Sequence, residues 1–256
     1  GIVMGSDSDW PVMKAAADAC AEFGVPYEAD VVSAHRMPED MVAWGRAAHT
    51  RGLKVVIAGA GPTGLTAALA LRSAGLAPLV LESRSFQHGV YLGATMASET
   101  TAAAVGQVGV VRNDPFAMLP FCGYNMGDYF AHWLNMGQRG TASSLPKLFQ
   151  VNWFRTGDDG KFLWPGYGDN IRVLKWIIER VRGEGAAVES PIGLLPQPGA
   201  LDTRGLDLPS GAMDQLLSVD VEAWQKEAER STQFLSKFGA HMPEALWDEH
   251  RQLKAR

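Results

Sequence analysis

The sequence predicts an α/β protein in two parts: a doubly wound parallel sheet over residues 1–84, followed by an α+β region over residues 85–256. Up to about Arg84, short apolar runs alternate with amphipathic stretches. Alternation of this kind is typical of parallel strands joined by right-handed helical crossovers. Beyond that point aromatic residues, glycine and proline become dense and the alternation fades. We therefore place the domain boundary there.

The composition excludes several classes of protein. Of the 256 residues, 46% are hydrophobic and 20% are charged, which supports a sizeable core and argues against disorder. The net charge of −5 argues against a nucleic-acid binder, which needs a basic face. No apolar run approaches the ~18 residues of a membrane span. We expect a cytoplasmic protein with a small-molecule partner and leave the oligomeric state open.

Strands and helices alternate in the first part. Strands are expected at residues 2–4, 27–32, 54–58 and 79–81. Helices are expected from Pro11 to Gly24, around Met41, Trp44 and Ala48, and over 65–73. Pro11 suits a helix start because its missing N–H is not needed there, and Gly24 suits a helix end. Together these elements predict a flavodoxin-like or Rossmann-like sheet.

Periodic segments are fewer in the second part. Residues 148–154 predict a strand, and residues 171–181 predict a helix with one apolar side. A loop rich in proline, glycine and leucine is expected over 191–210, a helix over 221–238, and a basic tail end over 251–256. The side chains expected to face inward are Leu174, Ile177, Ile178 and Val181 on the first helix, and Trp224, Ala228, Leu235 and Phe238 on the second.

Polar residues follow the first two strands at what would be one edge of the sheet. Ser6 and Asp9 lie in a turn before a helix, where free N–H groups and the helix dipole favour an anion such as phosphate. His35 and Arg36 end the second strand, where one could move a proton and the other could hold a phosphate. The alternative is a helix cap together with a surface His–Arg pair.

The strings GSDSDW at residues 5–10 and SAHR at residues 33–36 give residues 1–60 a resemblance to class I carboxyaminoimidazole ribonucleotide mutases. The resemblance implies that Ser6, Asp9 and Arg36 bind the ribonucleotide and that His35 is the catalytic acid/base. Met37 stands where that family usually has threonine. Beyond Gly61 the sequence leaves the family pattern, so the far half of that active site is expected to be absent.

A strand leads into a GxGxxG pattern formed by Gly59, Gly61 and Gly64, and Glu82 ends the next expected strand. This arrangement is typical of a turn that holds a pyrophosphate, with the acid on a ribose hydroxyl. Residues 55–83, with the string GAGPTGLTAALAL, resemble the βαβ unit of flavin-dependent aromatic-ring monooxygenases, which makes FAD an alternative cofactor. The alternative is a glycine-rich crossover that binds nothing. A second flavin motif is lacking, since Gly157–Gly160 reads as a hairpin turn.

Residues 85–256 resemble the C-terminal portion of GTP-dependent phosphoenolpyruvate carboxykinases. The strings that carry this resemblance are HGVY at 88–91, DPFAM at 114–118, VNWFR at 151–155 and FLWPGYGDN at 162–170. The resemblance implies that Phe154, Phe162 and Tyr167 stack on a guanine ring and that Asn170 reads its edge. Aromatic faces suit this role, although on composition alone they would be core residues.

The rest of a carboxykinase site is not found in the sequence. No GxxxxGK[ST] phosphate loop occurs, and Ala97 stands where some relatives carry a phosphate-contacting arginine. His88, His132, His241 and His250 have no acidic neighbour at metal-ligand spacing, so no metal site is expected. We interpret the chain as a chimera of three family segments that binds a nucleotide, GTP first, without turnover. Residual carboxykinase or mutase activity, and a chimera without ligand, are the alternatives.

Overall fold

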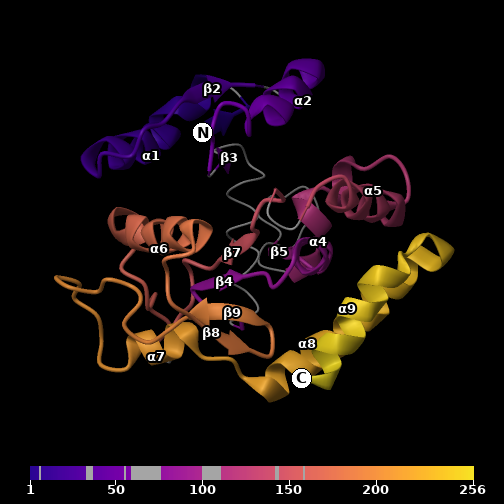
Figure 1. Cartoon of the computed structure of the whole chain (residues 1–256). Helices are drawn as coiled ribbons and strands as arrows, with labels where there is room; N and C mark the ends of the chain where they lie inside the picture. The colour runs from indigo at the N-terminus through magenta and orange to yellow at the C-terminus, as the bar shows by residue number, and fades with distance from the viewer. Residues whose placement is uncertain are drawn as a thin grey trace. The chain divides into compact units, whose positions relative to one another are not determined.

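Figure 1 shows the computed structural model of the chain. The structure describes residues 1–5, 7–32, 37–54, 56–58, 76–99, 111–141, 144–157 and 159–256. The chain divides into two compact units, unit 1 (Gly1–Thr66) and unit 2 (Ala67–Arg256). The helix expected over 65–73 lies outside the described residues.

Unit 1 is built on three short parallel strands. The strands are β1 (Ile2–Met4), β2 (Ala29–Val31) and β3 (Ile57–Ala58), in the order β2-β1-β3. Helices α1 (Trp10–Glu22) and α2 (Pro38–Ala47) alternate with them. This confirms the parallel α/β pattern expected for the start of the chain. β2 and β3 are shorter than expected.

A small apolar core holds α1 against β1. It is made of Ile2, Met4, Met13 and Ala17, each at most 7% exposed. α1 ends where Gly24 adopts a φ of 64°, a conformation that glycine reaches without strain. Gly24 therefore ends the helix as the sequence predicted.

The central sheet of unit 2 is antiparallel. It contains β4 (Val80–Glu82), β7 (Phe149–Val151), β8 (Ala187–Ser190) and β9 (Gly193–Pro196) in the order β7-β4-β9-β8. β4 pairs antiparallel with both β7 and β9. The prediction that residues 79–81 form a fourth parallel strand beside residues 1–58 is therefore wrong. Val80 and Leu81 are at most 1% exposed, and a strand covered on both faces has the same apolar pattern in either kind of sheet.

Two other expectations for unit 2 need correction. The loop expected over 191–210 begins with β9, which forms a hairpin with β8. The basic tail end expected over 251–256 belongs to helix α9 (Glu244–Ala255), which has a buried side that includes Leu246. The helix expected over 221–238 is confirmed as α8 (Val221–Leu235), followed by a 3-10 segment.

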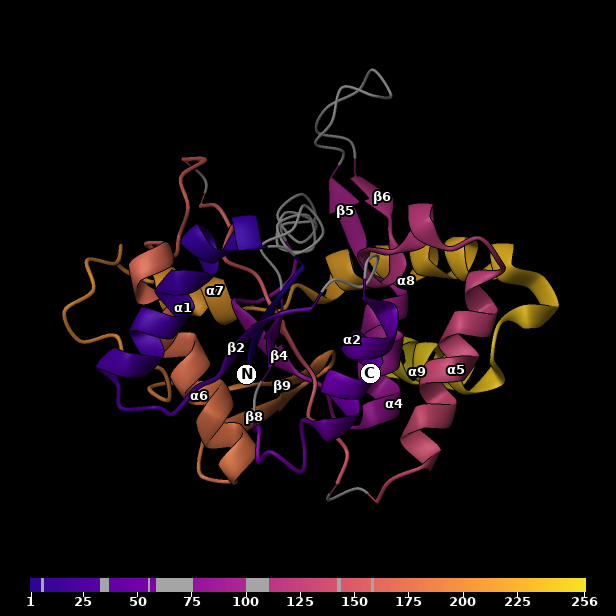
Figure 2. The same ribbon diagram turned by 90° about the horizontal axis from the view of Figure 1, so that it is seen from above.

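Helices flank the sheet of unit 2 on two sides. In both views α6 (Asn170–Arg182) and α7 (Ala212–Leu217) lie on one side of the sheet. Helices α4 (Phe86–Ala94), α5 (Met126–Gln138), α8 and α9 gather on the other side (Figure 2). A two-stranded ribbon of β5 (Ala97–Glu99) and β6 (Val111–Asn113) follows α4. Short 3-10 segments occupy Asp7–Asp9, Pro115–Ala117, Leu119–Phe121, Tyr167–Asp169 and Ser236–His241.

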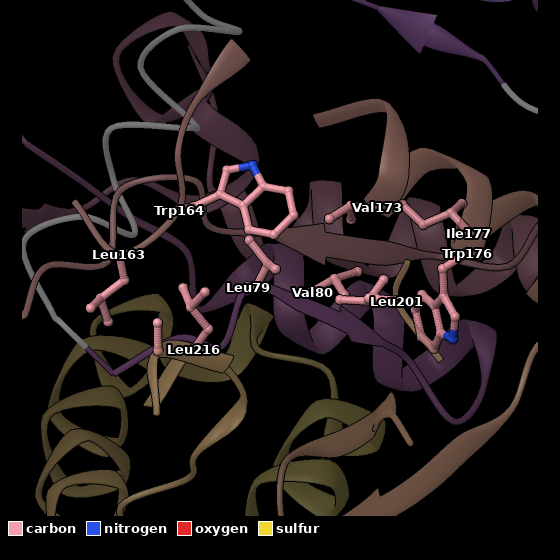
Figure 3. Close-up of a cluster of buried hydrophobic side chains, with 10 residues drawn as sticks. Leu79, Val80, Leu163, Trp164, Val173, Trp176, Ile177, Leu201 and Leu216 are labelled. Atoms are coloured by element: carbon pink, nitrogen blue, oxygen red, sulfur yellow. The ribbon is translucent and has the colours of Figure 1, made fainter. Parts of the chain in front are cut away.

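Each side of the sheet has its own apolar core. Figure 3 shows the core beside α6, where Leu79 and Val80 meet Trp164, Val173 and Trp176. The buried side of α6 consists of Val173, Trp176 and Ile177, whereas Leu174, Ile178 and Val181 are only half-buried. The apolar side of α6 is thus rotated from the expected one, because Trp176 rather than Ile178 points into the core.

The second core joins α4, α5, α8 and α9. Leu235 and Phe238 are buried there as predicted, together with Phe130 and Leu246. Two helical glycines allow the close packing: a Cβ on Gly93 would lie 2.6 Å from a ring carbon of Phe116, and one on Gly127 would meet the backbone of His241. No described helix is long and apolar enough to cross a membrane.

A buried imidazole adds a pH dependence to this core. His88 is 4% exposed, and its Nδ1 accepts a hydrogen bond from the backbone N–H of Arg84 at 3.0 Å. Burial, reinforced by the charge of Arg84, lowers the pKa of His88 to about 4. The folded state therefore binds fewer protons than the unfolded state between about pH 6.5 and 4, so stability falls as the pH is lowered through that range.

We predict that His88→Gln flattens this acid response. From pH 6.5 to 4 the parent should lose about 2–3 kcal/mol of unfolding free energy more than the variant, as its pKa shift implies. Urea titrations at several pH values measure the difference. The exposed His132→Gln variant serves as the control and should follow the parent. Parallel curves for parent and His88→Gln would contradict the prediction.

Candidate functional site

The site begins where β7 leaves the sheet. Asn152 follows β7 and is completely buried, with 0% exposure. Its Nδ2 donates to the carbonyl oxygen of Ala77 at 2.8 Å, and its Oδ1 accepts from the backbone N–H of Phe154 at 3.1 Å. Its own N–H donates to the carbonyl of Leu79 at 2.9 Å. One side chain therefore fixes the path from the sheet to Phe154.

A hairpin then brings two phenylalanine rings together. The backbone N–H of Leu163 donates to the carbonyl of Arg155 at 2.8 Å, and Thr156 forms a bridge with Phe162. The rings of Phe154 and Phe162 consequently lie 5.7 Å apart between centroids, at an interplanar angle of 62°. The turn expected at Gly157–Gly160 is confirmed, with Gly160 at a φ of 74°.

The two rings differ in exposure. Phe162 is 48% exposed, whereas Phe154 is half-buried. An aromatic ring that is neither in the core nor fully in solvent presents a face to which another flat group can stack. The hairpin is anchored from outside by Arg155, whose guanidinium donates to the carbonyl and the hydroxyl of Ser218 at 3.0 and 2.9 Å.

Asn170 is held by a tryptophan of the core. Trp164 is 1% exposed, and its indole N–H donates to Oδ1 of Asn170 at 2.9 Å. Figure 3 shows the Trp164 ring against Leu79 and near Val173. This bond turns Oδ1 of Asn170 towards the indole and so fixes which end of the amide carries the donor group, Nδ2. Sequence reasoning gave Trp164 no part in the predicted guanine site, because its apolar neighbours marked it only as core.

Other residues of the predicted nucleotide sites are not placed. The side chain of Tyr167 lies outside the described residues, as do Ser6, His35 and Arg36. Asp9 precedes the first turn of α1. The glycines Gly59, Gly61 and Gly64 of the GxGxxG turn also lie outside the described residues. The anion and pyrophosphate sites of the first 64 residues therefore stay predictions.

Glu82 has a different environment from the expected one. It is 3% exposed; its Oε1 accepts from Nζ of Lys147 at 2.8 Å, and its Oε2 accepts from Nε of Arg180 at 2.5 Å. The sequence placed Glu82 at the end of a parallel strand, facing a ribose. In the structure the strand is antiparallel and both carboxylate oxygens bind cations of the same chain, so the expected role does not fit.

His250 and His241 of unit 2 contact polar side chains of the fold. His250 lies between the hydroxyl of Tyr91, 2.8 Å from Nδ1, and the hydroxyl of Thr232, 2.7 Å from Nε2. His241 contacts Asp128 at 2.9 Å. Across the described ranges, no group of three or more histidine, cysteine, aspartate or glutamate residues could hold a metal ion.

Comparison with known proteins identifies the larger part of the chain. Residues 67–256 match the family model "Phosphoenolpyruvate carboxykinase C-terminal P-loop domain". The chain belongs to this family. The carboxykinase match begins at the first residue of unit 2, and it includes β4, in agreement with the pairing of β4 inside that unit.

Curated relatives carry the same name. The chain is 58% identical over 180 residues to the phosphoenolpyruvate carboxykinase [GTP] of Neocallimastix frontalis, covering 70% of this chain and 29% of the relative. It is 52% identical over 182 residues to that of Treponema pallidum strain Nichols, covering 70% and 29%. It is 50% identical over 179 residues to that of Arthrobacter sp. strain FB24, also covering 70% and 29%. The chain thus spans under a third of these carboxykinases.

The first part of the chain matches a different family. Residues 1–80 match the AIR carboxylase family model, which supports the purine-synthesis resemblance found for residues 1–60. The flavin monooxygenase resemblance of residues 55–83 receives no support, since the two matching family models together cover those residues. The boundary predicted near residue 84 stays a prediction.

Removing the side chain of Asn152 should destabilise the carboxykinase region. Asn152→Ala leaves the buried Ala77 carbonyl and the Phe154 N–H without their partner, at a cost of about 2–4 kcal/mol. Urea unfolding followed by tryptophan fluorescence measures the change. Asn135→Ala, at an exposed position of α5, is the control and should stay within about 0.5 kcal/mol of the parent. Equal midpoints for the two variants would show that Asn152 does not hold the hairpin.

Proposed function

We propose that the carboxykinase region binds a guanine nucleotide through Phe154, Phe162, Tyr167 and Asn170. The observation that carries the proposal is the oriented amide of Asn170, held by the indole of Trp164, next in the chain to a hairpin that pairs two aromatic rings. The named activity of the relatives, phosphoenolpyruvate carboxykinase [GTP], is consistent with this ligand. The proposal concerns binding, and turnover is not part of it.

Stacking supplies most of the affinity in this proposal. A purine base that stacks on an aromatic side chain gains about 1–3 kcal/mol by alanine substitution. Phe162 offers the more exposed ring, and Phe154 supports it at 5.7 Å. Two or three such contacts, set against the entropy lost on association, correspond to a dissociation constant on the order of millimolar. All purines share this contribution because every base has a flat face.

The edge contact distinguishes guanine from adenine. The Oδ1 of Asn170 accepts from Trp164, so Nδ2 faces the ligand as a donor. Guanine presents the O6 acceptor at the edge where adenine presents its N6 amino donor. A fixed donor therefore favours guanine and opposes adenine. Selectivity in this proposal depends on the tryptophan that fixes the amide as much as on the asparagine itself.

A second, separate site is proposed on the first unit. The AIR carboxylase match over residues 1–80 favours ribonucleotide binding by Ser6, Asp9 and Arg36, with His35 as the acid/base. The guanine site and the ribonucleotide site lie on parts of the chain that match different families. The interpretation of the chain as a chimera is supported by these two matches, because they are to different families.

Guanosine should bind more tightly than adenosine, and Asn170→Ala should remove the preference. Phe162→Ala should weaken both nucleosides by about tenfold, the lower part of the range for lost stacking. Saturation-transfer NMR with the two nucleosides, titrated against the full chain, measures both effects. Phe121→Ala, at a ring that is 67% exposed and outside the hairpin, is the matched control and should change neither affinity.

Trp164→Phe tests the orientation of the amide separately. It removes the indole N–H and keeps an aromatic ring, so guanosine and adenosine should converge while Phe162 still stacks. Near-ultraviolet circular dichroism establishes that the variant is folded. Equal signals for the two nucleosides in the parent, or none for guanosine, would show that these aromatics recognise no base.

A further inference from the structure

A cavity of about 860 Å³ lies in unit 2, away from the phenylalanine pair. Its walls come from the end of β4, the start of α4, one side of α5, the segment before β7, the C-terminal half of α6 and the start of α9. Every lining residue belongs to unit 2. A volume of this size accommodates a metabolite, since small-molecule sites typically enclose about 300–1,000 Å³.

The cavity holds more cations than carboxylates. Lys147 and Arg180 both line it, and both bind the single buried carboxylate of Glu82, at 2.8 and 2.5 Å. The other charged residues of the lining have partners elsewhere: Arg84 pairs with Glu189, and Glu244 pairs with Arg251. One positive charge of the Lys147–Arg180 pair therefore remains uncompensated beside a buried carboxylate.

The same two cations have N–H groups that are not used in the hydrogen bonds described for them. The ammonium of Lys147 donates to Glu82 and to the carbonyl of Arg180 at 3.0 Å, which uses two of its three N–H groups. The guanidinium of Arg180 uses Nε on Glu82 and Nη1 on the carbonyl of Gly185 at 2.6 Å. Within the described part of the chain, Nη2 of Arg180 has no acceptor. Both cations that line the cavity thus keep N–H groups that could donate to a ligand.

Part of the cavity wall is apolar. Phe86, Leu134, Leu145 and Leu194 line the cavity together with two prolines. A bare inorganic ion would leave this wall uncovered, whereas an anionic group on an apolar body would meet both surfaces. We propose that the cavity binds a small organic anion. Its carboxylate or phosphate group lies on Lys147 and Arg180, and its apolar body lies against this wall.

The anion cavity is separate from the guanine site. Asn170 begins α6 and Arg180 lies ten residues further along the same helix, a distance of about 15 Å at 1.5 Å per residue. The aromatic residues Phe154, Phe162 and Trp164 do not line the cavity. Each site can therefore be tested, and can fail, without the other.

The test uses the full chain with phenyl phosphate and phenylacetate as probes and benzyl alcohol as their neutral analogue. Isothermal titration should give saturable 1:1 binding of both anions and much weaker binding of the alcohol. Lys147→Met should weaken the anions by about tenfold or more, the loss expected for a charge-assisted hydrogen bond, and Lys147→Arg should restore them. Glu82→Gln should strengthen them several-fold, because both cations then face the ligand alone.

Lys175→Met is the matched control, since Lys175 lies on α6, the helix of Arg180, does not line the cavity, is 58% exposed and pairs with Glu179. Its affinity for both anions should equal that of the parent. Saturating guanosine and Phe162→Ala should also leave anion binding unchanged, which separates this proposal from the guanine site. Three results would overturn it: no anion binding, equal binding of benzyl alcohol, or equal losses in Lys147→Met and Lys175→Met. Near-ultraviolet circular dichroism of each variant establishes that it is folded.

Discussion

The carboxykinase region depends on one constraint, the complete burial of β4 between two antiparallel partners. Leu79, Val80 and Leu81 are each at most 1% exposed, so this strand can only exist with a layer of side chains on each face. One layer is the core beside α6, and the other is the cluster in which Leu81 packs with Ile192 and Leu195. The strand pairs in register with β7, which sets where the chain leaves the sheet at Asn152. The position of the phenylalanine hairpin follows from that exit.

The same strand ends in a buried acid, Glu82. Glu82 continues the buried run at 3% exposure, and a carboxylate at that depth requires cations and hydrogen bonds. Lys147 reaches it from the segment before β7 and Arg180 reaches it from α6. The buried carboxylate therefore links the sheet to the far end of the helix whose first residue is Asn170. The proposed guanine site and the proposed anion cavity involve residues near opposite ends of that one helix, Asn170 and Arg180.

Periodicity in the sequence predicted the elements whose patterns are local. The strand at 2–4, the helix ended by Gly24, and the helix beginning at Val221 have the expected type and nearly the expected bounds. Pairing partners were not predictable, because the apolar run of β4 is the same in a parallel and an antiparallel sheet. Helices α4 and α5 were missed for a physical reason. Their glycines, such as Gly93 and Gly127, are needed for close packing against Phe116 and His241, and the density of glycine in this region hides the helical pattern. Resemblance located Phe154, Phe162 and Asn170, but only the structure shows that Trp164 orients the amide.

The hydrogen bonds around His250 favour one tautomer of its imidazole. The Thr232 hydroxyl is placed to donate its single proton to the carbonyl of Ala228 at 3.0 Å. With that bond made, the hydroxyl oxygen accepts from Nε2 of His250, 2.7 Å away, which then carries the imidazole proton. Nδ1 is then the acceptor, and the phenol of Tyr91 donates to it at 2.8 Å. In this tautomer all three hydrogen bonds run in one direction, from Tyr91 of α4 through His250 of α9 to Thr232 and the backbone of α8. The three helices are thus joined by a polarised relay in which each member is donor on one side and acceptor on the other.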